Sequence, residues 1–352
     1  MYILLAIVLF GVLIFVHELG HFMAAKLLGV RVNEFAICMG PAIWQKRVGE
    51  TTYSLRCIPV GGYCAMEGED ELSHDPRAFT SKAKWRQAVI LVAGAFMNFV
   101  AGLLILAVLM SMQQSFAVPV ISSFYEGNEI EGADGLQVGD TLYSIDGHRV
   151  YLYNDIALLL QRGTDADYDL VVLRDGEKVA LDQFHMEPKT FVIDGQERRL
   201  YGMTFDRVER SVWQVLKATW YTSIDFGRMV IWGLQDLISG AVGLSDFSGP
   251  VGIVSAISET GKDSETVSQG VLNVLYIGAF LAINLAYMNM LPIPALDGGR
   301  VFFLVVTAVI EKLSRRKLNP KYEGYIHAVG MVALLGFMAV VTFSDIFKLV
   351  MG

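Results

Sequence analysis

Four long runs without a charged residue dominate this sequence. They cover residues 2–16, 87–125, 270–296 and 326–344. A helix that crosses the hydrocarbon core of a bilayer needs about 20 mostly apolar residues. Together with their flanks, the runs predict four membrane-spanning helices over residues 3–26, 88–112, 271–296 and 326–347. Only 18% of the residues are charged, which is too few for an ordinary cytosolic enzyme or a disordered chain.

Charge is distributed unevenly along the chain. Residues 113–270 carry 24 acidic and 12 basic side chains, a net charge of −12, whereas the remainder carries +4. We therefore expect a soluble, acidic insert between the second and third spans. This balance argues against a nucleic acid as partner, because its phosphate backbone is also negative.

Basic residues in the two short loops predict the orientation in the membrane. Cytoplasmic loops carry an excess of lysine and arginine. We therefore expect both loops in the cytoplasm and the N-terminus, the insert and the C-terminus outside. These basic residues include Lys26, Arg31, Lys46, Arg47, Lys82, Lys84 and Arg86 in the first loop and Lys312, Arg315, Arg316, Lys317 and Lys321 in the second.

The first loop has the composition of a small β-sheet within about residues 30–68. Its segments are rich in β-branched and aromatic residues and are separated by glycine turn signals. The segments are Val32–Cys38, Ala42–Val48, Thr52–Ile58 and Val60–Met66. We expect a hairpin sheet beside the bilayer or dipping into it. Irregular backbone at membrane depth must be buried or line a wet cavity, so the loop hints at a cavity.

The insert is predicted to be a compact α+β domain over residues 113–207. Two Asp-Gly pairs, Asp175-Gly176 and Asp194-Gly195, are strong signals for hairpin turns. The second hairpin is expected to extend to about Phe205. The other predicted elements are strands at Pro119–Phe124, Thr141–Ile145, Tyr168–Leu173 and Lys178–Phe184 and a short helix at Asp155–Arg162.

The first two spans belong to residues 1–112, and the last two belong to residues 269–352. Between the insert and the last two spans, residues 208–268 form a separate segment. The stretch 211–239 is apolar, but charged residues interrupt it, and its Trp and Tyr residues suit a membrane interface. We favour amphipathic helices on the outer membrane surface, with a fifth span as the alternative.

The first predicted span contains His17-Glu18-Leu19-Gly20-His21, an H-E-x-x-H motif. Positions i and i+4 share one face of a helix, so both imidazoles are able to bind one metal ion. Glu18 would stand beside that ion and take a proton from its bound water. The alternative is that these residues only hydrogen-bond a neighbouring helix. Three ionisable groups in one span are costly, which favours the metal site.

A catalytic zinc ion takes three protein ligands and leaves one position open. Asp297 is the best third candidate, because it ends the third uncharged run with no other carboxylate nearby. Pro292 and Pro294 break the helix before it and force an extended stretch. Two alternatives are that Asp297 only caps a helix, and that His327, at the start of the fourth span, is the third ligand.

These motifs resemble the site-2 protease family of intramembrane zinc metalloproteases, in its bacterial branch with four spans. H-E-x-x-H in the first span is joined by N-x-x-P-x-P-x-x-D-G, from Asn289 to Gly298. The resemblance extends to the motifs Pro59-Val60-Gly61-Gly62-Tyr63, Gly94–Asn98 and Ser248-Gly249-Pro250-Val251-Gly252. Where family members often carry Gly-Pro in the second span, this chain has Gly94-Ala95-Phe96.

The resemblance implies a polytopic α-helical membrane protein with four transmembrane helices, a membrane-associated β-hairpin sheet and an α+β PDZ-like extracytoplasmic insert. It implies an intramembrane zinc metalloendopeptidase in the bacterial cytoplasmic membrane, with its site near the cytoplasmic side. One zinc ion per chain would be held by His17, His21 and Asp297, with Glu18 as acid and base and Asn289 near the substrate. Implied substrates are single-span proteins, such as clipped anti-sigma factors or signal-peptide remnants.

The hairpin edge in residues 52–66, with Gly61, Gly62 and Tyr63, is a candidate for pairing with an unwound substrate as an added strand. A purely structural sheet is the alternative. The PDZ-like insert would either bind an extended peptide or exclude bulky substrates, and both interpretations stay open. A catalytically inactive scaffold and a transporter are the competing functions. A transporter would be expected to show paired repeats, and none are visible.

Overall fold

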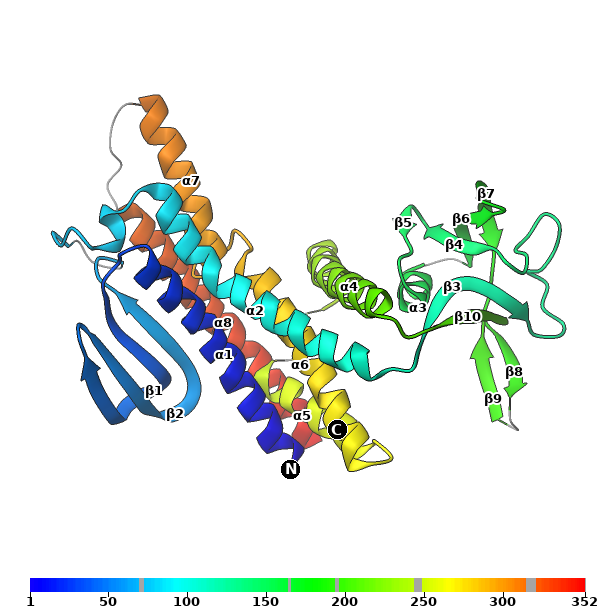
Figure 1. Cartoon of the computed structure of the whole chain (residues 1–352), viewed down its shortest axis with the longest axis horizontal. Helices are drawn as coiled ribbons and strands as arrows, with labels where there is room; N and C mark the ends of the chain where they lie inside the picture. Colours follow the sequence, from blue (N-terminus) through cyan, green and yellow to red (C-terminus); the bar gives the residue numbers. More distant parts are fainter. Residues whose placement is uncertain (70–72, 164–165, 194–195, 244–248, 315–320, 352) are drawn as a thin grey trace. The chain divides into compact units, whose positions relative to one another are not determined.

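The structure is a computed structural model that describes residues 1–351 except 70–72, 164–165, 194–195, 244–248 and 315–320 (Figure 1). The chain divides into two compact units. The helical unit comprises residues 1–106 and 226–352, and the insert unit comprises residues 107–225. Each unit is described by itself.

The helical unit contains the four apolar helices predicted from the uncharged runs. Helices α1, α2, α6 and α8 are long and apolar enough to cross a membrane, which makes this a multi-pass membrane protein. Helix α6 ends seven residues earlier than predicted, because Pro292 and Pro294 follow it. The helices of this unit are α1 (Tyr2–Leu27), α2 (Lys84–Met112), α5 (Pro250–Lys262), α6 (Val267–Asn289), α7 (Asp297–Ser314) and α8 (Lys321–Met351).

Glycines set the close approach of the helices that carry the site. A Cβ added at Gly20 of α1 would lie 2.4 Å from the backbone oxygen of Ala93 in α2. A Cβ at Gly102 of α2 would lie 2.5 Å from Ile283 of α6. Small residues at such crossings let helix backbones approach closely in an apolar solvent, where packing replaces the hydrophobic effect. Helices α1, α2 and α6 are therefore held in close contact around the motif of α1.

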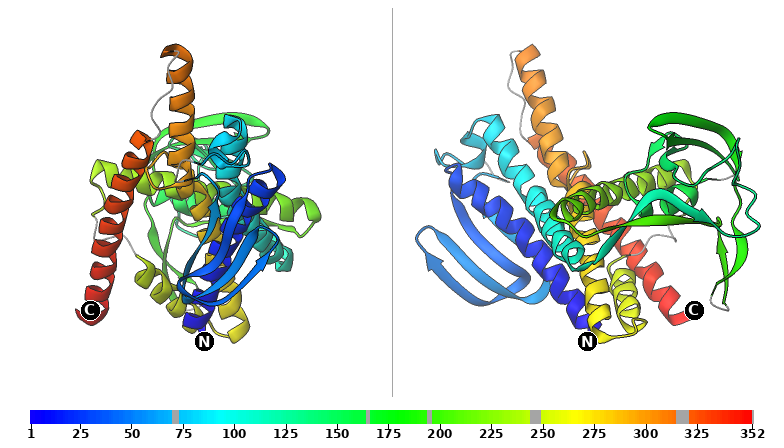
Figure 2. Two further views of the ribbon diagram at one scale, coloured as in Figure 1. Left: turned by 90° about the vertical axis from the view of Figure 1, so that its left-hand side faces the viewer. Right: turned by 45° about the vertical axis from the view of Figure 1, so that its right-hand side comes forward.

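The first loop forms two long, bent strands, β1 (Val32–Val48) and β2 (Thr51–Met66), instead of four short ones. The predicted turns at Gly40 and Gly61 are bends within these strands, with φ values of +85° and +82°. Glycine adopts such values without steric cost, so the chain turns without ending the pairing. The sheet lies against α1, as Figures 1 and 2 show, and Phe35 shares a core with Ala25 of α1 and Ile90 of α2.

Because both strands bend, the sheet has an inner segment and an outer one. Phe35 of β1 pairs with Tyr53 on one side and with Cys64 on the other. Residues 52–55 also pair with residues 44–47, so both of their edges are occupied. Within the described sheet, residues 44–48 and residues 62–66 each pair on one edge only. One free edge of the sheet thus lies in the first strand, and the other lies in the second half of β2.

A buried carboxylate joins α8 to the start of α5. Asp345 is 4% exposed, and its Oδ2 accepts a hydrogen bond of 2.9 Å from the backbone N–H of Gly252. A Cβ at Gly249 would lie 2.8 Å from the same oxygen. A carboxylate at a helix N-terminus satisfies an unpaired N–H and interacts favourably with the helix dipole. Gly249, which lacks a side chain, therefore allows the start of α5 to pack closely on α8.

The insert unit is an α+β domain built on one antiparallel sheet with the order β10-β3-β4-β6-β7, with β5 on β4 and a separate β8–β9 hairpin. Ile121, Leu142 and Leu170 form part of its buried core. Its elements are β3 (Ser115–Phe124), β4 (Thr141–Ile145), β5 (His148–Arg149), α3 (Tyr153–Leu160), β6 (Asp167–Arg174), β7 (Glu177–His185), β8 (Lys189–Ile193), β9 (Gln196–Leu200) and β10 (Met203–Glu209).

The second hairpin of the insert is shorter than predicted. Its strand β9 ends at Leu200, and the expectation that it extends to about Phe205 is wrong. Gly202 has a φ of +77°, and the chain turns there to pair β10 with β3, with Phe205 opposite Ile121. Helix α4 (Val212–Ser239) then follows as one continuous helix that is not among the four candidate spans.

We predict that replacing Arg174 by Met destabilises the insert. Asp140 is 1% exposed and accepts two hydrogen bonds of 2.8 Å from Arg174. Removing one partner of a buried ion pair costs about 3–5 kcal/mol, because the other charge stays buried and unpaired. Hydrogen exchange of the full-length protein in detergent should show faster exchange in β4 and β6. The control Arg198→Met, on the exposed strand β9, should leave exchange there unchanged; equal exchange in both variants would contradict the prediction.

Candidate metal centre

Three side chains predicted from the sequence to be metal ligands meet in the helical unit. His17 and His21 lie one turn apart on α1, and Asp297 is the first residue of α7. The Nε2 atoms of His17 and His21 lie 3.2 Å apart. The Oδ2 atom of Asp297 lies 3.1 Å from Nε2 of His17 and 3.3 Å from Nε2 of His21. All three side chains are largely shielded from solvent.

The size of this triangle fits a zinc ion. Zinc in proteins is tetrahedral with ligand distances of about 2.0–2.2 Å, which separates neighbouring ligand atoms by roughly 3.3 Å. The buried Oδ2 of Asp297 has no partner with hydrogen-bond geometry in the described part of the chain, although both imidazole nitrogens are close. Two nitrogens and one carboxylate oxygen are also a typical catalytic zinc donor set. The residues present therefore fit the ion.

Hydrogen bonds behind the imidazoles orient their Nε2 atoms toward the centre. Nδ1 of His21 lies 2.8 Å from the carbonyl oxygen of Ile90 in α2, so this nitrogen carries the proton and Nε2 is free to bind a metal. Nδ1 of His17 lies 3.4 Å from the amide of Asn98 and 3.5 Å from that of Asn289. Oδ1 of Asn98 is buried without a partner, so a half-turn of this amide would let it accept the Nδ1 proton.

Gly94 of α2 makes room for both imidazoles. A Cβ added there would lie 2.3 Å from Nε2 of His21 and 2.8 Å from Cε1 of His17. No side chain other than hydrogen fits under the rings at this position. The chain resembles the family at Gly94 even though it departs from the family pattern at Ala95.

The loop between α6 and α7 carries Asp297 to the centre. Gly298 and Gly299 pack tightly on the backbone of this loop, where an added Cβ would lie 2.3 Å from Met290 and 2.1 Å from Ile293. Ala295 has a φ of +80°, a left-handed conformation that costs an L-residue roughly 1–2 kcal/mol. Leu296 N–H donates to the carbonyl of Ile293 at 3.2 Å. The first turn of α7 is thus folded back against the prolines that precede it.

Glu18 lies between the two histidines in sequence and meets the free edge of β2. The backbone N–H of Cys64 donates a hydrogen bond to its carboxylate. A Cβ at Gly62 would lie 3.5 Å from Cγ of Glu18. Because Cys64 pairs with Phe35 on one side, its N–H to Glu18 leaves from the other side. The free edge of residues 62–66 therefore faces the motif of α1.

The other predicted residues of the hairpin have different surroundings. Gly61 forms a bend and packs against Met39. The Tyr63 hydroxyl interacts with Glu34, and its ring lies under Arg56 at 5.1 Å. Burial and this contact with Glu34 raise the pKa of Tyr63. The side chain of Tyr63 is thus engaged within the sheet and is not among the groups around Asp297.

Burial, with Glu18 nearby, raises the pKa of the Cys64 thiol. The thiol is therefore protonated at neutral pH, and a protonated thiol is neither a metal ligand nor a nucleophile. Among the described residues, the one group of His, Cys, Asp and Glu side chains with metal-binding spacing is His17, His21 and Asp297.

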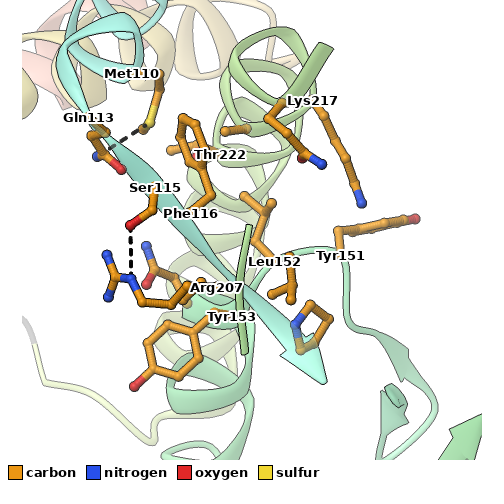
Figure 3. A pocket seen from close by; sticks show the side chains of 16 residues that line it. Met110, Gln113, Ser115, Phe116, Tyr151, Leu152, Tyr153, Arg207, Lys217 and Thr222 are labelled. Carbon is orange, nitrogen blue, oxygen red and sulfur yellow. Dashed lines mark hydrogen bonds between the residues drawn. The ribbon is translucent and has the colours of Figure 1, made fainter. Parts of the chain in front are cut away.

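A pocket in the insert unit contains none of the predicted site residues. It lies where β3, β10 and the start of α3 meet the first half of α4, and Figure 3 shows its lining. Arg207, one of the lining residues, donates to the hydroxyl of Ser115 at 2.9 Å. Tyr151 and Lys217 also line the pocket. No aspartate, glutamate or histidine is among the residues that line this pocket, so the candidate metal centre is separate from it.

Sequence reasoning did not assign roles to the groups behind the ligands. The carbonyl of Ile90 has no sequence signal, because every residue has one. Asn98 offered two signals, because it ends the Gly94–Asn98 motif and is one of few polar residues within the second uncharged run, but no role was assigned to it. His327 is not in the cluster; its Nδ1 accepts a hydrogen bond of 3.1 Å from Ala295.

The chain is similar to known peptidases over almost its whole length. The profile of "Peptidase family M50" matches residues 5–337. The "Putative zinc metalloprotease CPE1693" of Clostridium perfringens is 33% identical over 350 residues, 98% of each chain. The "Regulator of sigma-W protease RasP" of Bacillus subtilis is 26% identical over 427 aligned positions, 97% of each chain. The "Zinc metalloprotease RasP" of Geobacillus kaustophilus is 28% identical over 424 positions, 97% of each chain.

We predict that Gly94→Ala removes the bound metal, because the new methyl group overlaps the ring of His21. Metal content per purified chain, measured by mass spectrometry, should fall to a small fraction of the wild-type value. Gly11→Ala is a matched control, because a Cβ at Gly11 in α1 meets no atom within 4 Å. A Gly94→Ala protein that folds and retains a full complement of metal would show that the imidazoles lie elsewhere.

Proposed function

This chain belongs to peptidase family M50 and is a zinc metalloprotease, and we propose that it cuts peptide bonds of single-span proteins within the membrane. We assign His17, His21 and Asp297 as its zinc ligands and Glu18 as its catalytic acid and base. The observation that carries the proposal is the convergence of three ligand atoms within 3.3 Å at an apolar helix. Ionisable groups in a spanning helix are retained for function, because they are costly there.

Glu18 is suited to the proton transfers of peptide hydrolysis. Zinc, when bound, lowers the pKa of its water to about 7 and polarises the scissile carbonyl. Glu18 follows the ligand His17 directly and takes the proton of the attacking water. It then delivers this proton to the nitrogen of the leaving amine. The N–H of Cys64 fixes its carboxylate for both steps.

We propose that the free edge of residues 62–66 binds the substrate as an added strand. A helical substrate hides its amides in i→i−4 hydrogen bonds and must unwind before it is cut. An exposed strand edge supplies replacement hydrogen bonds for an unwound segment. The contact between Cys64 and Glu18 supports this proposal, because an added strand would run past the catalytic carboxylate. Gly62, without a side chain, leaves room for it.

Asn289 is proposed to serve the substrate as well as the site. Asn289 is the last residue of α6, and its amide lies 3.5 Å from Nδ1 of His17, next to the centre. One relative is named as a regulator of sigma-W. For this chain we propose membrane substrates of the same general kind, single-span anti-sigma factors already clipped outside or signal-peptide remnants. The protein is proposed to act within the lipid bilayer and to have no nucleic acid as partner.

We propose that the site opens to the cytoplasm in the bacterial cytoplasmic membrane. The basic loops after α1 and after α7 support this orientation, with both termini and the acidic insert outside. We further propose that residues 113–207 form a PDZ-like domain that either binds an extended segment or excludes bulky substrates. Helix α4 is proposed to lie at the outer interface, since Trp213 and Trp220 are exposed.

The first prediction tests the assignment of roles. Glu18→Gln should retain about one zinc per chain and lose cleavage of a single-span reporter by about 10²–10⁴-fold, the usual share of a general base. Asp297→Ala should lose zinc and activity together. Glu126→Gln, exposed in the insert, is the matched control for Glu18. Cleavage that survives Glu18→Gln would favour an inactive scaffold or a transporter, and full zinc in Asp297→Ala would require another third ligand.

The second prediction tests substrate pairing on β2. The test uses synthetic single-span substrates, each with one N-methylated amide near the cleavage site. The cleavage rate should depend on the methylated position with a period of two residues. Methylation at alternate positions should slow cleavage about tenfold or more, because it removes N–H groups that face the strand. Methylation at the intervening positions should have little effect. Equal slowing at adjacent positions would contradict pairing and leave the sheet a structural role.

A further inference from the structure

The residue two positions before Asp297 has an unfavourable backbone conformation. Ala295 has a φ of +80°, a region that favours glycine. Such a conformation persists only where the surrounding structure enforces it. The other backbone hydrogen bonds of the loop are local, from Ile293 to Leu291 and from Leu296 to Ile293. A contact from outside the loop must therefore help to hold Ala295.

His327 of α8 supplies this contact. The backbone N–H of Ala295 donates to Nδ1 of His327 at 3.1 Å. The ring of Phe303, in α7, packs edge-on against the imidazole at 5.4 Å. Gly330, one turn further along α8, lies directly on Pro294, where an added Cβ would be 2.3 Å from the Cβ of the proline. Helix α8 thus contacts both Pro294 and Ala295, in the loop between α6 and α7 that carries Asp297.

We infer that His327 is a positioning residue that fixes the left-handed turn at Ala295 and so holds Asp297 at the metal centre. The inference rests on the proposed function, in which Asp297 is a zinc ligand. Because Nδ1 accepts a hydrogen bond from Ala295, this nitrogen is not available to a metal. In this role His327 acts on the metal centre through Ala295 instead of as a third ligand. Groups that hydrogen-bond a metal ligand directly typically contribute 10–100-fold to metal affinity, and for His327, which acts through the loop, we expect an effect at the lower end of this range.

The test measures zinc release from the full-length protein in detergent. Transfer of zinc to a coloured chelator gives a dissociation rate that does not depend on proteolysis. His327→Ala should release zinc about tenfold faster than wild type or more. His327→Asn should stay near the wild-type rate, because its side-chain oxygen is able to accept the same hydrogen bond. Val332→Ala, at an exposed position of α8, is the matched control.

A second variant separates this role from general packing. In the double variant Ala295→Gly with His327→Ala, glycine adopts the left-handed conformation without the hydrogen bond, so zinc release should return toward the wild-type rate. Wild-type zinc release from His327→Ala would overturn the inference. Fast release from His327→Asn together with no rescue by Ala295→Gly would overturn it as well, since the ring itself would then be needed.

Two further variants distinguish failure of this inference from failure of the proposed site. His17→Ala and Asp297→Ala should abolish zinc binding if the ligands are assigned correctly. If both retain zinc, the site assignment fails and the inference fails with it. If both lose zinc while His327→Ala releases it at the wild-type rate, the site stands and the inference alone is wrong.

Discussion

The fold of the helical unit depends on bringing two imidazoles and one carboxylate together in an apolar setting. Uncompensated polar groups in hydrocarbon are expensive, and a shared cation is one way to compensate all three. The neighbouring features serve that convergence. Gly94 leaves space for the rings, the carbonyl of Ile90 orients His21, and the glycines after Asp297 let the loop fold back on itself. The hairpin adds Cys64, whose N–H reaches the remaining carboxylate, Glu18.

Sequence reasoning predicted the three side chains that meet in the structure, because their signals are local or unique. H-E-x-x-H places both histidines on one face of a helix, and Asp297 stands without a competing carboxylate behind two prolines. The supporting groups were beyond reach for a physical reason. A backbone carbonyl carries no residue signature, and the fit of Gly94 beneath His21 is a property of two helices in contact. His327 was a candidate ligand because histidine commonly binds zinc. Only the structure shows that its Nδ1 accepts a hydrogen bond from the backbone of Ala295.

The fold was predictable to a similar depth. Apolar runs mark helices α1, α2, α6 and α8, and the turn signals of the first loop mark positions of positive φ at Gly40, Gly49 and Gly61. Whether a glycine bends a strand or ends it depends on its partners, so four predicted strands became two. The return of β10 to β3 brings Phe205 opposite Ile121 and was missed, because pairing between distant segments leaves no local pattern.

The distance in sequence between the ligands has a consequence for biosynthesis. His17 and His21 enter the membrane with the first helix, whereas Asp297 comes 276 residues after His21. A nascent protein therefore has no complete centre while its first two helices, hairpin and insert are being made. On the proposed assignment of ligands, the third ligand joins the first two only after α7 has been made. A protease that shares its membrane with many unfinished proteins would in this way stay inert during most of its own synthesis.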